Sequence, residues 1–333
     1  MTTAVQGRAR KERSDPEPEP RAGWVTRLRR SYDQHWYAWV MCTPVVVVLG
    51  ALVGFPLVQG VLLTFTNANS LNVGRTIGVN HIPDSYTWTG FSNYVDLLTG
   101  ADNQLVPHFV WTIAWTFLCV ALTVSTGLGL AVLMNRKMRG RTFYRLLLIL
   151  PWAVPTFVTV FSWRLLLSDG GAVNGLLGLL HLGTPSWLSS PYWMKTAAIL
   201  VNTWCGVPFM MLSFLGGLQS IPSELYEAAE MDGATPWQRF TQVTLPGLRP
   251  VSSTVTLLGI IWTFNQFTVI YLLFGAGGSD SVQILVTYAY QLFFGQMPQD
   301  YAGSAAVGVI CLSILVVFTA FYRRWLSRNE ATA

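Results

Sequence analysis

The sequence predicts an all-α, polytopic membrane protein with six transmembrane helices. Charged residues make up 11% of the chain and hydrophobic residues 52%, whereas soluble domains carry about 25% charged residues. Six separate apolar runs each reach the roughly 20 residues that a helix needs to cross a bilayer. Aromatic residues account for 13%, including 14 Trp, which suits a protein with ring side chains at two lipid–water interfaces.

The six spans are predicted in order along the chain. They are expected at about residues 39–65, 107–134, 145–167, 195–218, 251–274 and 302–321. Residues 1–30 are polar and carry both charges, with Pro16, Pro18 and Pro20 among them, so they predict a disordered tail. No apolar run follows a short basic region there, so no cleavable signal peptide is predicted. Residues 31–326 are expected to form one transmembrane domain, followed by a short tail at 327–333.

The intervals between the spans differ in character. Residues 66–106 are polar, with scattered Gly, Asn and Pro. Residues 172–182 are apolar but too short to cross a bilayer, and both an interfacial helix and a re-entrant turn remain open for them. A glycine-rich turn with Gly275, Gly277 and Gly278 begins the last interval.

The basic residues predict the orientation. Eighteen of the 21 Lys and Arg lie on one side: eight in the N-terminal tail, five between Arg136 and Arg145, two at Arg239 and Arg249, and three after the last span. The positive-inside rule places this side in the cytoplasm, and both termini with it. The formal charge of +5 is therefore a topology signal, and no nucleic-acid partner is predicted.

The spans lack the residues that several other functions require. None contains Asp or Glu, which argues against a proton or sodium relay. Arg164 is the one charge clearly inside a run, and it is expected to extend to the outer interface. No phosphate-binding loop, metal-ligand spacing or catalytic constellation is present, so neither a metal site nor an enzyme is predicted. Four widely separated cysteines are expected to be apolar filler: Cys42, Cys119, Cys205 and Cys311.

The longest polar interval with helical pattern is 220–248. After Pro222, acidic residues recur every three positions beside a face of small residues. Gly233 should end this helix. Thr235, Pro236 and Gln238 then form a capping-box pattern that begins a second helix, expected to end before Pro246. Two interpretations remain open: a docking surface for another protein, and a well-capped connecting loop without a partner.

This interval carries a known motif. The pattern Glu-Ala-Ala, three residues, Gly, nine residues, Ile or Val, one residue, Leu-Pro is present as Glu227-Ala228-Ala229, Gly233, Val243 and Leu245-Pro246. It resembles the signature of permease subunits of binding-protein-dependent ABC importers. Other segments resemble the sugar-importing branch of that family: Asn202-Thr203-Trp204, the residues from Trp262 to Phe267, and Gly277-Gly278. The resemblance implies the type I ABC importer permease fold.

The resemblance also implies functional residues. The motif helix would be a coupling helix that docks on a cytoplasmic ATPase, through Glu224, Glu227, Ala228, Ala229, Asp232 and Gly233. Sugar contacts in maltose-importing members match Asn202, Cys205, Gly206, Phe209, Trp262, Thr263 and Gln266. An aromatic ring can stack on a sugar ring, and amides and a hydroxyl can bind its hydroxyl groups. Hydrogen bonding between helices is the alternative role for these polar residues.

The implied partners follow from the same resemblance. They are a second homologous permease, two copies of a nucleotide-binding ATPase subunit, an extracellular solute-binding protein and a sugar. The resemblance implies that the sugar is a di- or oligosaccharide and that the assembly lies in a bacterial plasma (inner) membrane. ATP and Mg would bind to the ATPase subunits, and this chain would hold no cofactor. The interval 66–106 is too short for the large extracellular domain of the maltose-importing members.

Two other function classes remain as hypotheses. One is a permease of the same superfamily for a non-sugar solute such as glycerol phosphate. Because charged solutes usually need a charged partner in the path and the spans offer only Arg164, a neutral polyhydroxy solute is favoured. The other is a membrane scaffold or ion-driven carrier, which would function without an ATPase.

Overall fold

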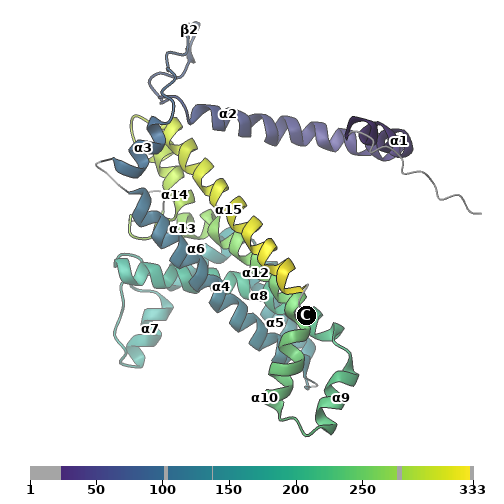
Figure 1. The fold of residues 1–333 in the computed structure, drawn as a ribbon. Helices are drawn as coiled ribbons and strands as arrows, with labels where there is room; N and C mark the ends of the chain where they lie inside the picture. Colours follow the sequence, from purple (N-terminus) through teal and green to yellow (C-terminus); the bar gives the residue numbers. More distant parts are fainter. Residues whose placement is uncertain (1–23, 101–103, 137, 276–279, 331–333) are drawn as a thin grey trace, which may run out of the picture. The chain divides into compact units, whose positions relative to one another are not determined.

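The computed structural model describes residues 24–330 except 101–103, 137 and 276–279, and they are mainly helical (Figure 1). The chain divides into two units, residues 1–59 and 60–333. The first unit contains α1 (Trp24–Leu49), the π-helical turn η1 (Gly50–Gly54) and the start of α2 (Phe55–Leu63). Residues Trp36–Leu63 form a 28-residue apolar helix that is long enough to cross a bilayer.

The predicted N-terminal tail differs from the structure at its end. α1 begins at Trp24, so residues 24–30 are helical where the sequence predicted disorder, and residues 1–23 lie outside the described part. The last proline of this region is Pro20. The Arg and Leu residues that follow it are good helix formers, which explains why the helix extends beyond the apolar run.

The second unit contains the remaining elements. Its hairpin pairs β1 (Arg75–Ile77) antiparallel with β2 (Asn80–Ile82), with Arg75 opposite Ile82. The longer helices are α4 (Leu105–Asn135), α5 (Arg141–Ala153), α6 (Thr156–Leu166), α8 (Pro191–Ser220), α12 (Arg249–Phe264) and α15 (Tyr301–Glu330). The shorter ones are α3 (Ser92–Thr99), α7 (Ala172–Leu179), α9 (Ser223–Met231), α10 (Pro236–Arg239), η2 (Phe240–Thr244), α11 (Leu245–Gly247), α13 (Phe267–Phe274), α14 (Leu285–Tyr290) and η3 (Gln291–Gly295).

The helices supply up to six membrane spans. Among the described residues, four helical segments are long and apolar enough to cross a membrane: Trp36–Leu63, α4, α8 and Tyr301–Arg328 of α15. Two bent pairs, α5 with α6 (96°) and α12 with α13 (41°), bring the number to six if each pair is one span. Each of these segments coincides with one of the six predicted apolar runs.

The two bends have identifiable causes. Between α5 and α6 lies Val154-Pro155, and proline both lacks an N–H donor and disfavours a helical residue before it. Between α12 and α13, Asn265 leaves the helix and its side-chain Nδ2 donates to the Ile261 carbonyl at 3.1 Å. The sequence predicted both runs as spans but did not predict either bend.

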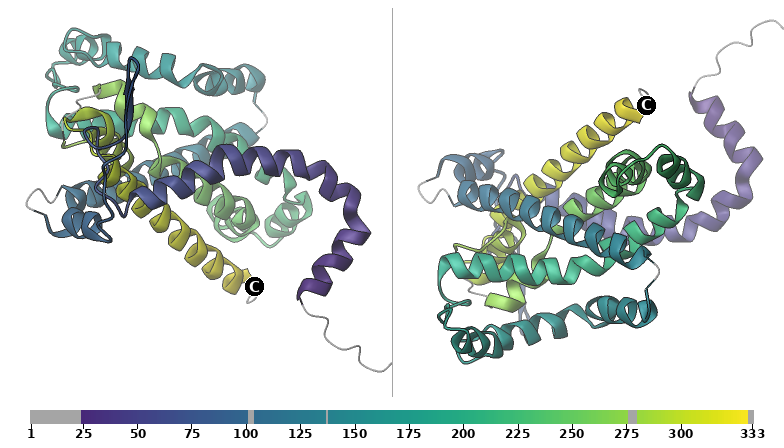
Figure 2. Two further views of the ribbon diagram at one scale, coloured as in Figure 1. Left: turned by 90° about the horizontal axis from the view of Figure 1, so that it is seen from above. Right: turned by 90° about the horizontal axis from the view of Figure 1, so that it is seen from below.

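Helices α4, α8 and α12 form the centre of the second unit. Figure 2 shows α4 (blue) and α8 (teal) crossing each other at close range. Their largest buried cluster combines Ala131, Met134, Met210, Met211, Phe214, Leu215, Leu218, Leu248 and Val255. Trp115 of α4 is fully buried and its Nε1 donates to the Thr263 carbonyl at 3.0 Å. That bond attaches α4 to the end of α12, next to the break before α13.

A glycine makes the close crossing of α4 and α8 possible. A Cβ added at Gly127 would lie 2.5 Å from Met210 Cβ and 3.1 Å from the Met211 backbone nitrogen, whereas one at Gly129 would meet nothing within 4 Å. Overpacking of this kind costs about 1–3 kcal/mol. We therefore expect Gly127→Ala to lower the thermal unfolding temperature in detergent, monitored by size-exclusion chromatography after heating, while Gly129→Ala does not. Equal unfolding temperatures for the two variants would contradict this packing.

Several intervals between the spans contain short helices. Residues 172–182, where the sequence left an interfacial helix and a re-entrant turn open, contain α7. Its Asn174 is buried, and Asn174 Oδ1 accepts a hydrogen bond from Trp187 Nε1 at 2.9 Å. The interval before α15 contains α14 and η3, which were not predicted, and the Gly277-Gly278 motif within it lies outside the described residues. Finally, α15 continues to Glu330, into the predicted C-terminal tail.

Candidate functional site

All seven residues predicted to contact a sugar line one cavity in the second unit. Its volume is about 430 Å³, within the roughly 300–1,000 Å³ typical of small-molecule sites. The cavity lies where α8 passes the break between α12 and α13. The predicted lining residues are Asn202, Cys205, Gly206, Phe209, Trp262, Thr263 and Gln266. The structure therefore brings together side chains from two spans that are separated by more than 50 positions in the sequence.

Aromatic rings form one wall of this cavity. The Phe209 and Trp262 ring centroids are 4.9 Å apart with the planes at 61°, and Trp152 lies beyond Phe209 at 6.2 Å. Trp262 remains 54% exposed. Because an aromatic face left open beside a cavity can stack on another ring, this wall is suited to a ligand with an apolar ring face.

Two amide side chains give the cavity hydrogen-bonding groups beside its aromatic wall. Gln266 Nε2 donates to Asn202 Oδ1 at 3.3 Å, and Asn202 is 6% exposed. This bond joins α8 to the break between α12 and α13, so the hydrogen bonding between helices that the sequence left open is present for this pair. The Asn202 amide also interacts with the Cys119 side chain. The Gln266 amide lines the cavity and has a second donor hydrogen and a carbonyl oxygen that a hydroxyl group can use. No charged side chain of the described residues lines the cavity.

Gly206 contributes to the wall by its lack of a side chain. A Cβ there would lie 2.9 Å from Thr123 Cγ2, so the glycine lets α8 approach α4 closely. A larger residue at position 206 would therefore push α8 away from α4. Cys205 is a free thiol on the same helix, half-buried in the wall.

Sequence reasoning missed other lining residues. Trp152, Thr156 and Asn265 also border the cavity. Trp152 lies between Pro151 and Pro155, at the bend between α5 and α6, and this pair of prolines was the signal that the third run would not be a straight span. The bend carries Trp152 and Thr156 to the cavity.

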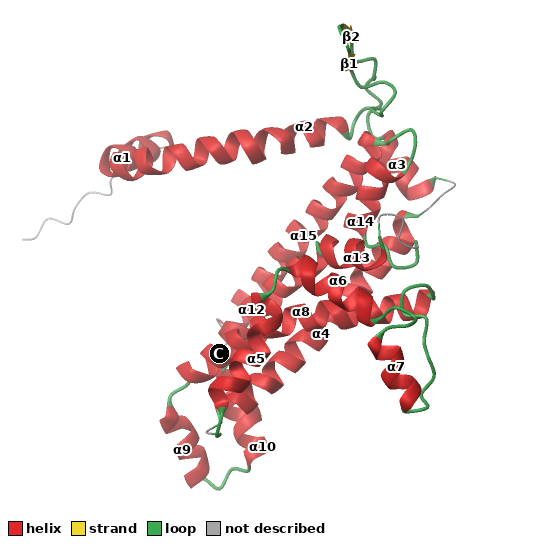
Figure 3. Cartoon of the chain, turned by 180° about the vertical axis from the view of Figure 1, so that it is seen from behind, coloured by secondary structure: helices red, strands yellow, loops and turns green. Residues whose placement is uncertain are grey.

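A second candidate site is the polar loop formed by α9 and α10, at one end of the second unit (Figure 3). Gly233 has φ +79°, and its N–H donates to the Glu230 carbonyl at 3.0 Å while that of Ala234 donates to the Ala229 carbonyl at 2.9 Å. These bonds end α9 at a left-handed glycine, as predicted. The predicted capping box is also present, with Thr235 N donating to Gln238 Oε1 at 2.7 Å.

Two side-chain contacts hold this loop together. Arg239 Nη1 and Glu230 Oε2 are 3.2 Å apart, which links α10 to α9. The hydroxyls of Tyr226 and Thr244 are 3.0 Å apart, which links α9 to η2. The loop is thus a braced pair of helices rather than an irregular connection.

The expected end of the second loop helix was wrong. The sequence predicted an end before Pro246, but the chain remains helical through η2 and α11. In the π-helical turn the Leu245 N–H donates to the Phe240 carbonyl, five residues back. This wider turn displaces the carbonyl with which the Pro246 ring would otherwise collide, so the helix passes the proline.

The loop residues proposed for coupling lie at the surface. Five are exposed and Ala229 is half-buried; the exposed ones are Glu224, Glu227, Ala228, Asp232 and Gly233. Large apolar side chains accompany them, with Leu225 53%, Met231 88% and Trp237 71% exposed. Apolar side chains grouped at an exposed polar loop are typical of protein interaction sites.

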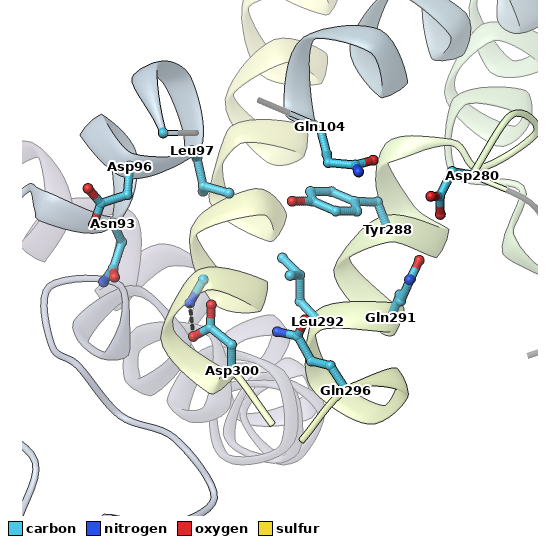
Figure 4. A pocket seen from close by; sticks show the side chains of 12 residues that line it. Asn93, Asp96, Leu97, Gln104, Asp280, Tyr288, Gln291, Leu292, Gln296 and Asp300 are labelled. Carbon is cyan, nitrogen blue, oxygen red and sulfur yellow. Dashed lines mark hydrogen bonds between the residues drawn. The ribbon is translucent and has the colours of Figure 1, made fainter. Parts of the chain in front are cut away.

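The opposite end of the second unit, beside α3, contains a polar hollow of about 550 Å³. Figure 4 shows Asp96, Asp280 and Asp300 on different sides of it. Asp300 Oδ1 accepts from the Gly303 N–H at 2.8 Å and thereby caps α15. Within the described residues, Asp96 and Asp280 form no ion pair. The Asp300 carboxylate is therefore explained by its role as a helix cap. The carboxylates of Asp96 and Asp280 have no such role in the described part of the chain, and they make this end of the unit acidic.

Comparison with known proteins agrees with this geometry. Residues 123–331 match the family described as "Binding-protein-dependent transport system inner membrane component", and the chain belongs to this family. It is therefore a multi-pass membrane protein of a family of transport components, not of enzymes. The diacetylchitobiose uptake system permease protein DasB of Streptomyces coelicolor is 35% identical over 298 residues, which cover 88% of this chain and 87% of DasB.

Two other curated relatives are longer than this chain. The maltodextrin transport system permease protein MdxF of Bacillus subtilis is 31% identical over 300 residues, 84% of this chain. The maltose/maltodextrin permease protein MalF of Escherichia coli K12 is 37% identical over 256 residues, 72% of this chain. The match spans 66% of MdxF and 50% of MalF.

A solved structure shares the fold. A chain in the crystal structure of a bacterial ABC transporter involved in the import of the acidic polysaccharide alginate superposes with a TM-score of 0.75 at 22% identity, covering 91% of this chain and 99% of that one. The protein thus has the type I ABC importer permease fold.

Proposed function

We propose that the chain is the permease subunit of an ATP-binding-cassette importer that translocates a carbohydrate of two or more sugar units. The cavity carries this proposal. It combines an open aromatic wall with amides and lacks a charged side chain among the described residues. Such a lining fits the apolar faces and hydroxyl groups of a neutral sugar, whereas a glycerol phosphate would place its charge without a partner. The sugars named for the DasB, MdxF and MalF relatives support the same solute class.

The proposed orientation puts the α9–α10 loop and both termini in the cytoplasm. The asymmetry of Lys and Arg supports it, because the N-terminal tail, the α4–α5 turn, Arg239 with Arg249, and the C-terminal end of α15 together carry 18 of the 21 basic residues. In this orientation the exposed face of α9, with Glu227, Ala228 and Gly233, docks on an ATPase subunit. Binding and hydrolysis of ATP with Mg by two such subunits would then move the spans around the cavity.

The remaining partners follow from the architecture. One chain presents one docking loop, whereas the ATPase subunits act as a pair, so a second homologous permease would present the other loop. An extracellular solute-binding protein would deliver the sugar to the end that carries α3. The whole assembly would lie in the bacterial plasma membrane.

The test is reconstitution of the chain in proteoliposomes with the permease, ATPase and solute-binding proteins encoded beside it. We expect ATP-dependent uptake of a saccharide, with maltotriose and diacetylchitobiose as the first probes and glycerol 3-phosphate as the charged comparison. Uptake of glycerol 3-phosphate in place of every saccharide offered would refute the sugar assignment. Solute transport by the chain without any ATPase subunit would refute the importer itself.

A further inference from the structure

The turn between α4 and α5 is strongly basic. The sequence contains no Asp or Glu between Asp102 and Asp169. Within that interval, arginines gather at the turn: Arg136, Arg139, Arg141 and Arg145. None of these four forms an ion pair within the described part of the chain. The positive charge at this turn is therefore not neutralised by the protein around it.

Arg145 holds the turn in place. Its Nη2 donates to the Met134 carbonyl at 3.2 Å, which joins the first part of α5 to the end of α4. Its Nε is shielded from solvent and has no acceptor among the described residues. The Arg145 guanidinium group thus positions the turn. Its positive charge also adds to that of the other arginines, and the sum attracts an anion at the turn.

An open depression lies at the turn. Its volume is about 690 Å³, and its lining consists of Met138, Arg139, Gly140, Arg141 and Thr142. Gly140 has φ +77°, a left-handed conformation that glycine adopts without strain and that reverses the chain between Arg139 and Arg141. The two arginines consequently border the same depression, where guanidinium groups can bind phosphate oxygens in pairs.

An exposed apolar stripe begins beside this depression. Phe143, Leu146, Leu147 and Leu150 follow the i, i+3, i+4, i+7 spacing of one helix face and are 66%, 65%, 55% and 56% exposed. The opposite face of α5, with Leu148 and Ile149, packs on the buried cluster of α4 and α8. The 31-residue helix α4, which is long and apolar enough to cross a membrane, ends at Asn135, immediately before the depression. This places the depression where a span would leave the bilayer.

We propose that this depression and stripe form a binding site for an anionic phospholipid. Arg139 and Arg141 hold the phosphodiester of the head group, and an acyl chain lies along Phe143, Leu146, Leu147 and Leu150. Basic pockets at the membrane interface attract anionic head groups in this way. The charge complementarity favours a lipid over a second protein helix, since a helix on the stripe alone would leave the arginines unpaired. This proposal uses residues of the α4–α5 turn and α5 only, and it rests neither on the sugar cavity nor on the α9–α10 loop.

The test uses the purified full-length chain in detergent and native mass spectrometry with added palmitoyl-oleoyl phosphatidylglycerol or phosphatidylcholine. We expect at least fivefold more retained phosphatidylglycerol than phosphatidylcholine, and a loss of that preference in the double variant Arg139→Gln/Arg141→Gln. The matched control, Arg323→Gln/Arg324→Gln, removes the same charge from the C-terminal part of α15 and should keep the preference. Size-exclusion profiles establish that each variant is folded.

A stripe variant separates the lipid from a soluble anion. Leu146→Ser/Leu147→Ser should also lower phosphatidylglycerol retention severalfold, because the acyl chain loses its contact. Inorganic phosphate at millimolar concentration should not displace the lipid. Equal retention by the arginine double variant and the wild type would overturn the site. Displacement by inorganic phosphate, or retention unaffected by the stripe variant, would overturn the lipid as its ligand.

Discussion

Replacing Trp262 with alanine is expected to lower saccharide uptake at least tenfold. The substitution removes the open ring face of the cavity wall and the edge-to-face contact with Phe209, 4.9 Å away. Loss of a large apolar contact with a bound ring costs about 1.5–3 kcal/mol, and every 1.4 kcal/mol is a factor of about ten in affinity. The measurement is ATP-dependent uptake of the transported saccharide by proteoliposomes that contain the complete transporter.

A matched tryptophan provides the control for that result. Trp325, near the C-terminal end of α15, is 53% exposed, nearly the same as Trp262 at 54%, and lies outside the cavity. Trp325→Ala should therefore transport normally. If both variants transport like the wild type, the cavity does not contact the solute during import. If both fail equally, the loss reflects the removal of an interfacial ring rather than of a binding wall.

The second large effect is expected in the α9–α10 loop. Gly233→Pro cannot adopt the native φ of +79°, because proline fixes φ near about −65°, and it removes the N–H that donates to the Glu230 carbonyl. We expect more than a tenfold loss of both uptake and solute-stimulated ATP hydrolysis while the permease pair still inserts. The single charge reversal Glu227→Arg should weaken the same two activities, because it changes the exposed face of α9 without altering the bend.

Controls for the loop variants lie at other places in the second unit. Gly183 also has a positive φ, +82°, and nothing lies within 4 Å of a Cβ added there. Gly183→Pro introduces comparable backbone strain away from the loop, and Asp169→Arg is the corresponding charge reversal. Both should keep ATP hydrolysis coupled to uptake. Coupling that is unchanged in Gly233→Pro and Glu227→Arg, with normal assembly, would remove the docking role from α9.

The sequence predicted the features that depend on interactions between residues close in the chain or on the length of a bilayer-spanning helix. Six apolar runs were evident because the bilayer demands long stretches without charge, and all six coincide with helices or bent pairs. The bend at Gly233 and the Thr235–Gln238 capping box were evident because left-handed glycine and capping bonds involve residues only a few positions apart. Both are present in the structure.

Features set by packing were not predictable in the same way. The 96° bend between α5 and α6 arises at Pro155, but hydropathy does not reveal how far a proline bends a span. The position of Trp152 in the cavity wall depends on that bend. Similarly, α14 and η3 are short helices whose apolar residues pack on α4 and α15, and such segments have too little periodicity to predict. The convergence of the seven lining residues came from the family resemblance rather than from spacing.

Photocrosslinking tests the central proposal, that this cavity receives the sugar, most directly. The complete transporter would be irradiated with a diazirine derivative of the transported saccharide, and the labelled peptides of this chain identified by mass spectrometry. We expect labelling in residues 202–209 of α8 and in residues 262–266, which span the end of α12 and the following break, and we expect excess unlabelled saccharide to suppress it. Labelling that is competed by the saccharide but confined to segments outside the cavity would contradict it.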